Sequence, residues 1–131
     1  MKRILIACGA LLVSAMSLAD ECSTASTQTA LNACTAAQYQ AADKTLNDAY
    51  AAVLKRAPET QKALLKIAQQ KWMALRDADC ALMSSGSAGG SIQPMINSQC
   101  MTDKTVERTA WLESLLHCDE GDISCPLPPG N

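Results

Sequence analysis

Leu64 to Cys80 reads LLKIAQQKWMALRDADC, and this stretch decides the fold. Five of its residues recur every three or four positions, so a helix would place them on one face: Leu65, Ala68, Trp72, Leu75 and Asp79. Arg76 follows Trp72 by one helical turn. Its guanidinium is expected to lie along the indole or to reach a carboxylate on a neighbouring helix. The stretch therefore predicts a helix whose packing face carries a fixed polar group.

Helical spacing continues on both sides of this stretch. A first helix is expected from a cap at Ser26 or Thr27 to about residue 56, a second over residues 58–83 and a third from about 94 to 117. The short connection between the first two predicts that they are antiparallel neighbours. Because no segment shows strand periodicity, we expect an all-α fold, a small disulfide-stapled assembly of three antiparallel helices.

The chain begins like an exported protein. Lys2 and Arg3 precede an apolar run that ends in Ser17-Leu18-Ala19, which is typical of a signal peptide over residues 1–19. Cys8 resembles a lipidation site, but the few residues before it leave no room for a charged region and an apolar core. No later apolar run is long enough to span a bilayer, so we expect a periplasmic or secreted protein without stable membrane insertion after signal removal.

Six cysteines remain after signal removal: Cys22, Cys34, Cys80, Cys100, Cys118 and Cys125. An even count in a small exported chain indicates disulfides, although the count alone leaves the pairing open. Local pairing is favoured, with Cys22 to Cys34, Cys80 to Cys100 and Cys118 to Cys125. A zinc site is the rival interpretation, but His117 is the only histidine and no CxxC motif is present, so no metal or cofactor is expected.

The remaining chain divides into a helical domain over residues 20–117 and a disulfide loop with a proline-rich tail over residues 118–131. Removing Lys2 and Arg3 lowers the basic count from 11 to 9 against 13 acidic residues, a formal charge of −4. This balance disfavours nucleic acid, since no basic cluster could contact phosphates. It favours encounter with a basic protein partner.

Polar residues on the helices allow a structural and a catalytic interpretation. In the structural one, Asp43 and Asn47 bond to Arg76 or Arg108 on facing helices. In the catalytic one, Asp43 would pair with Asp77 or Asp79 as acid and base. No nucleophile, metal ligand or phosphate-binding loop accompanies these acids, so no catalytic residue is expected. Trp72 and Trp111 are expected in the core.

Several motifs together resemble the LprI-type lysozyme inhibitor N-terminal domain family. They are Ala42-Asp43-x-x-Leu46-Asn47-x-x-Tyr50, Ala68-Gln69-x-x-Trp72-x-x-x-Arg76-Asp77-Ala78-x-Cys80, Gly89-Gly90-Ser91-Ile92 with Cys100, and Thr105-x-x-Arg108-x-x-x-Leu112. The resemblance extends from Cys22 to about Leu115. It implies an exported protein that binds and inhibits lysozyme-type muramidases, and it supplies no inhibitory residue.

The glycine-rich loop is the candidate partner-binding segment, with Gly86, Ser87, Gly89, Gly90 and Ser91 as its residues. It is either a plain linker or a rigid loop of small residues that enters an enzyme cleft lined with carboxylates, as a lysozyme cleft is. The alternative function is a non-inhibitory cell-envelope interaction module. An enzyme is the third hypothesis, and turnover of a small substrate would support it.

Overall fold

A computed structural model describes residues 22–128. In this part of the chain α2 spans Gln28–Arg56, α3 spans Glu59–Ser84 and α4 spans Gln93–Ser114, with the 3-10 turn η1 at Ser85–Ser87. The described residues contain no strand, so the all-α prediction is confirmed. The expected signal peptide lies outside the described residues.

The helix ends follow the predicted signals. The hydroxyl of Thr27 accepts the backbone N–H of Ala30 at 3.1 Å and caps α2. Pro58 stands at the start of α3, and Pro94 lies in the first turn of α4. α4 ends at Ser114, before the expected end at His117, because the backbone tightens there into i to i−3 hydrogen bonds.

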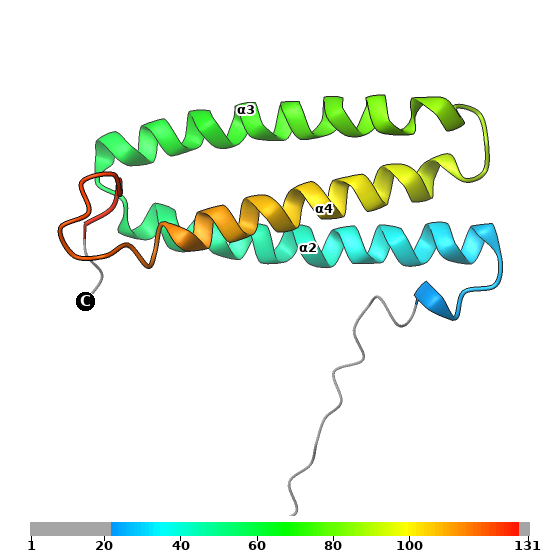
Figure 1. Ribbon diagram of the computed structural model, residues 1–131, viewed down its shortest axis with the longest axis horizontal. Helices are drawn as coiled ribbons and strands as arrows, with labels where there is room; N and C mark the ends of the chain where they lie inside the picture. The colour runs from blue at the N-terminus through cyan, green and yellow to red at the C-terminus, as the bar shows by residue number, and fades with distance from the viewer. Residues whose placement is uncertain (1–21, 129–131) are drawn as a thin grey trace, which may run out of the picture.

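Successive helices are antiparallel, so α2 and α4 run parallel to each other (Figure 1). α4 packs against both other helices and most extensively against α2, whereas direct packing of α2 on α3 is sparse. The expectation that the first two helices are close neighbours is therefore corrected. Small buried side chains such as Ala49 on α2 and Thr105 and Thr109 on α4 permit a close approach, while α3 turns Trp72 and Arg76 inward.

The face of α3 that packs inward differs from the predicted one. Leu65 is buried and Trp72 is half-buried, as expected, but Leu75 is 59% exposed and Ala68 is also exposed. Gln69 and Cys80 are buried instead, beside Arg76, whose inward position was expected. Their polar groups find partners inside the bundle, so the buried face lies to one side of the stripe that apolar periodicity selected.

The apolar core lies at the end where α2 and α4 finish, near the start of α3. Its buried residues are Leu46, Ala49, Val53, Ala57, Leu65, Leu112 and Leu127. Leu127 comes from the tail, which Arg56 holds by donating to the carbonyls of Leu116 at 2.8 Å and Pro128 at 3.0 Å. The segment after Cys118 therefore completes the helical core.

Among residues 22–128, three disulfides each join a cysteine to the next cysteine along the chain, which is the local pairing that the sequence favoured. Cys22–Cys34 ties the leading segment to α2, Cys80–Cys100 joins α3 to α4, and Cys118–Cys125 closes the loop before the tail. The first two lie at the end away from the apolar core. Covalent links thus hold the end of the bundle where buried aliphatic side chains are few.

Candidate partner-binding surfaces

A polar layer centred on Arg76 joins the three helices. The guanidinium donates to Asp77 at 3.0 Å and to the hydroxyl of Thr105 at 3.4 Å, and it lies 3.9 Å from the Asp43 carboxylate. It also sits 4.9 Å from the centre of the Trp72 ring. Both expected contacts of Arg76, with the indole and with a carboxylate on another helix, are therefore present.

Arg108 occupies a separate part of this layer. It donates to Gln69 at 3.0 Å and lies 5.5 Å from the Trp72 ring and 4.2 Å from the Trp111 ring. Burial lowers the pKa of Arg108, because removal from water disfavours its charged form. One of its terminal nitrogens is buried and makes no hydrogen bond within the described residues.

The network differs from the expected one in two residues. Asn47 is exposed and donates to Asp43 on its own helix at 3.4 Å, so it contacts Arg76 only indirectly. Arg108 pairs with Gln69, not with Asp43 or Asn47. Trp111 also departs from expectation, being 47% exposed at the edge of the core.

Each acidic residue of the catalytic interpretation lies near a basic side chain. Asp43 and Asp77 both face Arg76, and Asp79 lies 4.0 Å from Lys104 of α4. Burial raises the pKa of the nearby Tyr39 phenol, with Arg76 acting in the opposite direction and Asp43 adding to the rise. Within residues 22–128 no group of histidine, cysteine and acidic side chains is arranged to hold a metal ion.

The loop from Gly86 to Ser91 is exposed apart from the half-buried Ser87, and it is internally hydrogen-bonded. Gly89 has a φ of +77°, which favours glycine, and a Cβ on Gly90 would lie 3.1 Å from the Ser87 carbonyl oxygen. The N–H of Gly90 donates to that carbonyl at 2.9 Å. Asn32 of α2 donates to the carbonyl of Ser91 at 2.9 Å, which ties the loop to the bundle.

This loop forms one tip of the elongated molecule. Figure 1 shows it joining α3 to α4 at the end of the bundle opposite the C-terminal tail. The Cys80–Cys100 disulfide closes its base. Small side chains, a fixed backbone and a terminal position make the loop a segment that could enter a concave partner.

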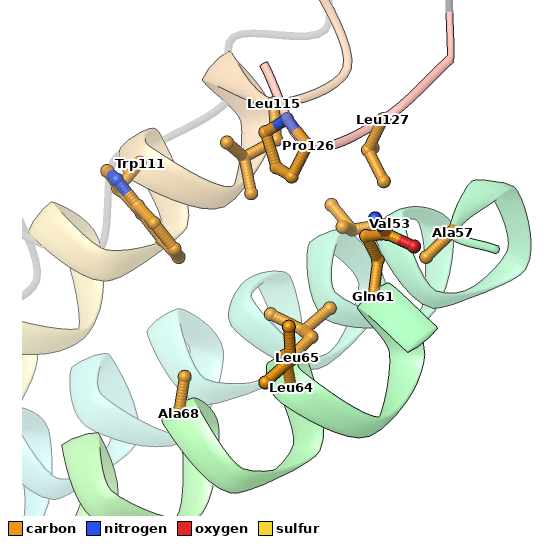
Figure 2. Close-up of a pocket in the computed structure, with 10 residues that line it drawn as sticks. All are labelled: Val53, Ala57, Gln61, Leu64, Leu65, Ala68, Trp111, Leu115, Pro126 and Leu127. Carbon is orange, nitrogen blue, oxygen red and sulfur yellow. The ribbon is translucent and has the colours of Figure 1, made fainter. Parts of the chain in front are cut away.

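A small apolar pocket was not predicted from the sequence. Its volume is about 170 Å³, and it lies between α3, the end of α4 and the tail. Leu64, Leu65 and Ala68 of α3 face Trp111 and Leu115 of α4 across it (Figure 2). Pro126 and Leu127 close one side. The pocket could not be predicted because it depends on where the tail packs, and no local sequence pattern specifies that position.

None of the helices in the described part of the chain combines the length and hydrophobicity needed to cross a bilayer.

Comparison with known proteins places this arrangement in a family. Residues 19–112 match the family described as lysozyme inhibitor LprI. An uncharacterized protein of Rhizobium meliloti (strain 1021) is 35% identical over 113 residues, covering 76% of this chain and 81% of the relative. No solved structure matches the chain. The matched region contains all three helices up to Leu112 and the whole glycine-rich loop, and we conclude that the chain belongs to the LprI lysozyme-inhibitor family.

Proposed function

We propose that this protein is exported and inhibits lysozyme-type muramidases by binding them in equal molar amounts. The observation that carries the proposal is the family match over residues 19–112, which includes the loop tip. Three disulfides support an extracytoplasmic location, since such bonds persist in oxidising compartments. A cleavable signal over residues 1–19 accounts for export.

The loop from Gly86 to Ser91 is the inhibitory segment in this proposal. Because its backbone is fixed before binding, little conformational entropy is lost when a partner encloses it. Its small residues and hydroxyl groups suit a cleft that binds a polar polysaccharide and is lined with carboxylates. The rest of the bundle acts as a scaffold and performs no chemistry of its own.

Charge supports the encounter step. The formal charge of the chain is −2, and it becomes −4 when Lys2 and Arg3 leave with the signal. Attraction to a basic lysozyme would raise the association rate and would weaken as salt is added.

A cell-wall lysis assay with the oxidised protein and several lysozymes tests the proposal. We expect lysis by at least one lysozyme to fall with added protein and to reach its minimum at equal molar amounts. Absence of any effect across the lysozyme classes would instead support the envelope interaction module.

Substitutions that keep the loop fold test its role. A Cβ on Gly86 meets nothing within 4 Å, and its φ is not positive, so Gly86→Trp adds bulk without strain. We expect this variant and Ala88→Trp to lose inhibition while melting like the wild type. Ile123→Trp, at a fully exposed position near the other end, is the matched control. Retained inhibition in both loop variants, or after replacing Gly86 to Ser91 by a neutral linker, would contradict this role.

A further inference from the structure

One side of α3 carries a stripe of exposed apolar side chains, and the stripe borders the apolar pocket at its Leu64 end. Leu64, Leu75 and Leu82 are 61%, 59% and 72% exposed. Ala68 and Ala78 lie between them and are also exposed. With Lys71, these positions follow one another at intervals of four and three, the spacing with which one helix packs along another.

The stripe has a symmetry in sequence. Counted in residues, Met73 lies midway between Leu64 and Leu82. It also lies midway between Ala68 and Ala78, and between Lys71 and Leu75. If two copies of α3 lay antiparallel with their midpoints at Met73, each leucine at one end would meet the leucine at the other end of its partner. The two alanine pairs would allow close approach, and the stem of Lys71 could cover Leu75 while its ammonium stays in water.

The two ends of the stripe also complement each other in shape. At the start of α3, Leu64 and Ala68 form one wall of the apolar pocket of about 170 Å³, with Trp111 opposite (Figure 2). At the other end, Leu82 and its neighbour Met83 project into solvent, with Met83 67% exposed. The antiparallel register brings these two side chains of one copy beside the pocket of the other.

From this geometry we infer that the protein forms a two-fold symmetric homodimer through α3, in which Leu82 and Met83 of each copy fill the apolar pocket of the other. Such an interface is isologous, because one patch supplies both the projecting and the receiving surface. The stripe from Leu64 to Leu82 is about 27 Å long at 1.5 Å per residue. One helix face of this length on each copy forms a limited contact, so we expect a reversible equilibrium between monomer and dimer.

The inference does not depend on the inhibitory role of the loop. The loop residues Gly86 to Ser91 lie beyond the stripe, and the dimer does not require a lysozyme. Ala88→Trp, five residues beyond Met83, should therefore leave the dimer intact, which separates a failure of this inference from a failure of the proposed function.

Sedimentation equilibrium of the oxidised protein over a wide concentration range tests the dimer. The wild type should show a reversible monomer–dimer equilibrium. Leu64→Lys and Leu82→Glu alter exposed side chains, so both variants should fold normally. Each should raise the dissociation constant of the dimer by at least about 10-fold. Val106→Glu, at a 56% exposed position on α4, is the matched control and should dimerise like the wild type.

The double variant Leu64→Lys with Leu82→Glu tests the register. In the antiparallel arrangement each introduced lysine lies beside an introduced glutamate of the other copy, so dimerisation should recover. A parallel pairing would place like charges together and would not recover. A wild type that stays monomeric up to its solubility limit, single variants that dimerise normally, or a double variant that stays monomeric would each overturn the inference.

Discussion

The guanidinium of Arg76 lies 4.9 Å from the centre of the Trp72 ring, one helical turn away on α3. Arg108 of α4 reaches the same ring at 5.5 Å, and Arg76 also contacts α2 through Asp43 and α4 through Thr105. This layer lies between the apolar core and the end of the bundle that holds the Cys22–Cys34 and Cys80–Cys100 disulfides. It stabilises the bundle where α3 stands away from α2.

Replacement of Arg76 should destabilise the fold strongly. Its side chain is 7% exposed, and Arg76→Ala would leave Thr105 and the Trp72 face without their partner. We expect the free energy of unfolding to fall by about 2–4 kcal/mol, measured by urea denaturation. Arg76→Lys should restore only part of it, because an ammonium does not reproduce the planar stacking.

The matched control for Arg76 is a surface ion pair. Lys44 and Asp48 lie 3.2 Å apart on α2 and are largely exposed, so Lys44→Ala should change stability by less than about 0.5 kcal/mol. Equal effects of the Arg76 and Lys44 substitutions would show that the polar layer does not stabilise the bundle.

Truncating Leu127 should destabilise the helical domain although the residue lies in the tail. Leu127 is 7% exposed and belongs to the core cluster. Leu127→Ala should lower the free energy of unfolding by about 2–3 kcal/mol through lost burial and the cavity that remains. Ile123→Ala, at a fully exposed position in the same segment, should leave the unfolding midpoint unchanged. A wild-type midpoint for both would mean that the tail does not contribute to the core in solution.

Removing the Cys80–Cys100 disulfide should affect the loop tip as well as stability. The bond spans 20 residues, and Cys80 is fully buried. The double variant Cys80→Ala with Cys100→Ala should lose roughly 3–4 kcal/mol. Amide exchange should also rise in residues 86–91. The corresponding double alanine variant of Cys22 and Cys34 tests whether this effect is local, because that bond joins only the leading segment to α2 and should leave exchange in the loop unchanged.

Alkaline pH should destabilise the protein through Tyr39. Burial raises the pKa of this phenol above its usual value of 10.0. The folded state therefore holds the proton more tightly than the unfolded state, so this stabilisation is complete below the usual pKa and is lost as pH rises through the raised pKa. Tyr39→Phe should reduce the decline of the unfolding midpoint in that range. The difference in phenolate absorbance between the wild type and this variant, followed as pH rises, should give the raised pKa of Tyr39 directly. A titration at the usual pKa would contradict the partial burial of Tyr39.

Helix number and boundaries could be predicted because strong local signals mark them. Thr27 caps α2, Pro58 separates α2 from α3, and the glycines after Ser84 end α3. The disulfide pairing could also be predicted, since short sequence separations favour local bonds. Each of these signals acts through the chemistry of one or two neighbouring residues.

Tertiary packing was harder to predict from the sequence. Alanine is so frequent that α2 and α3 offer several nearly equivalent apolar stripes, and Leu75 was assigned to the wrong one. Gln69 is buried because Arg108 on another helix donates to it, which periodicity cannot reveal. For the same reason the pairing of α2 with α4 and the docking of Leu127 required the structure.

Hydrogen–deuterium exchange of the oxidised protein with and without an inhibited lysozyme tests the central claim most directly. If the loop enters the enzyme, the amides of residues 86–91 should become protected, and the exposed amides around Ile123 should exchange as before. Protection confined to any other segment, with unchanged exchange in the loop, would contradict the account.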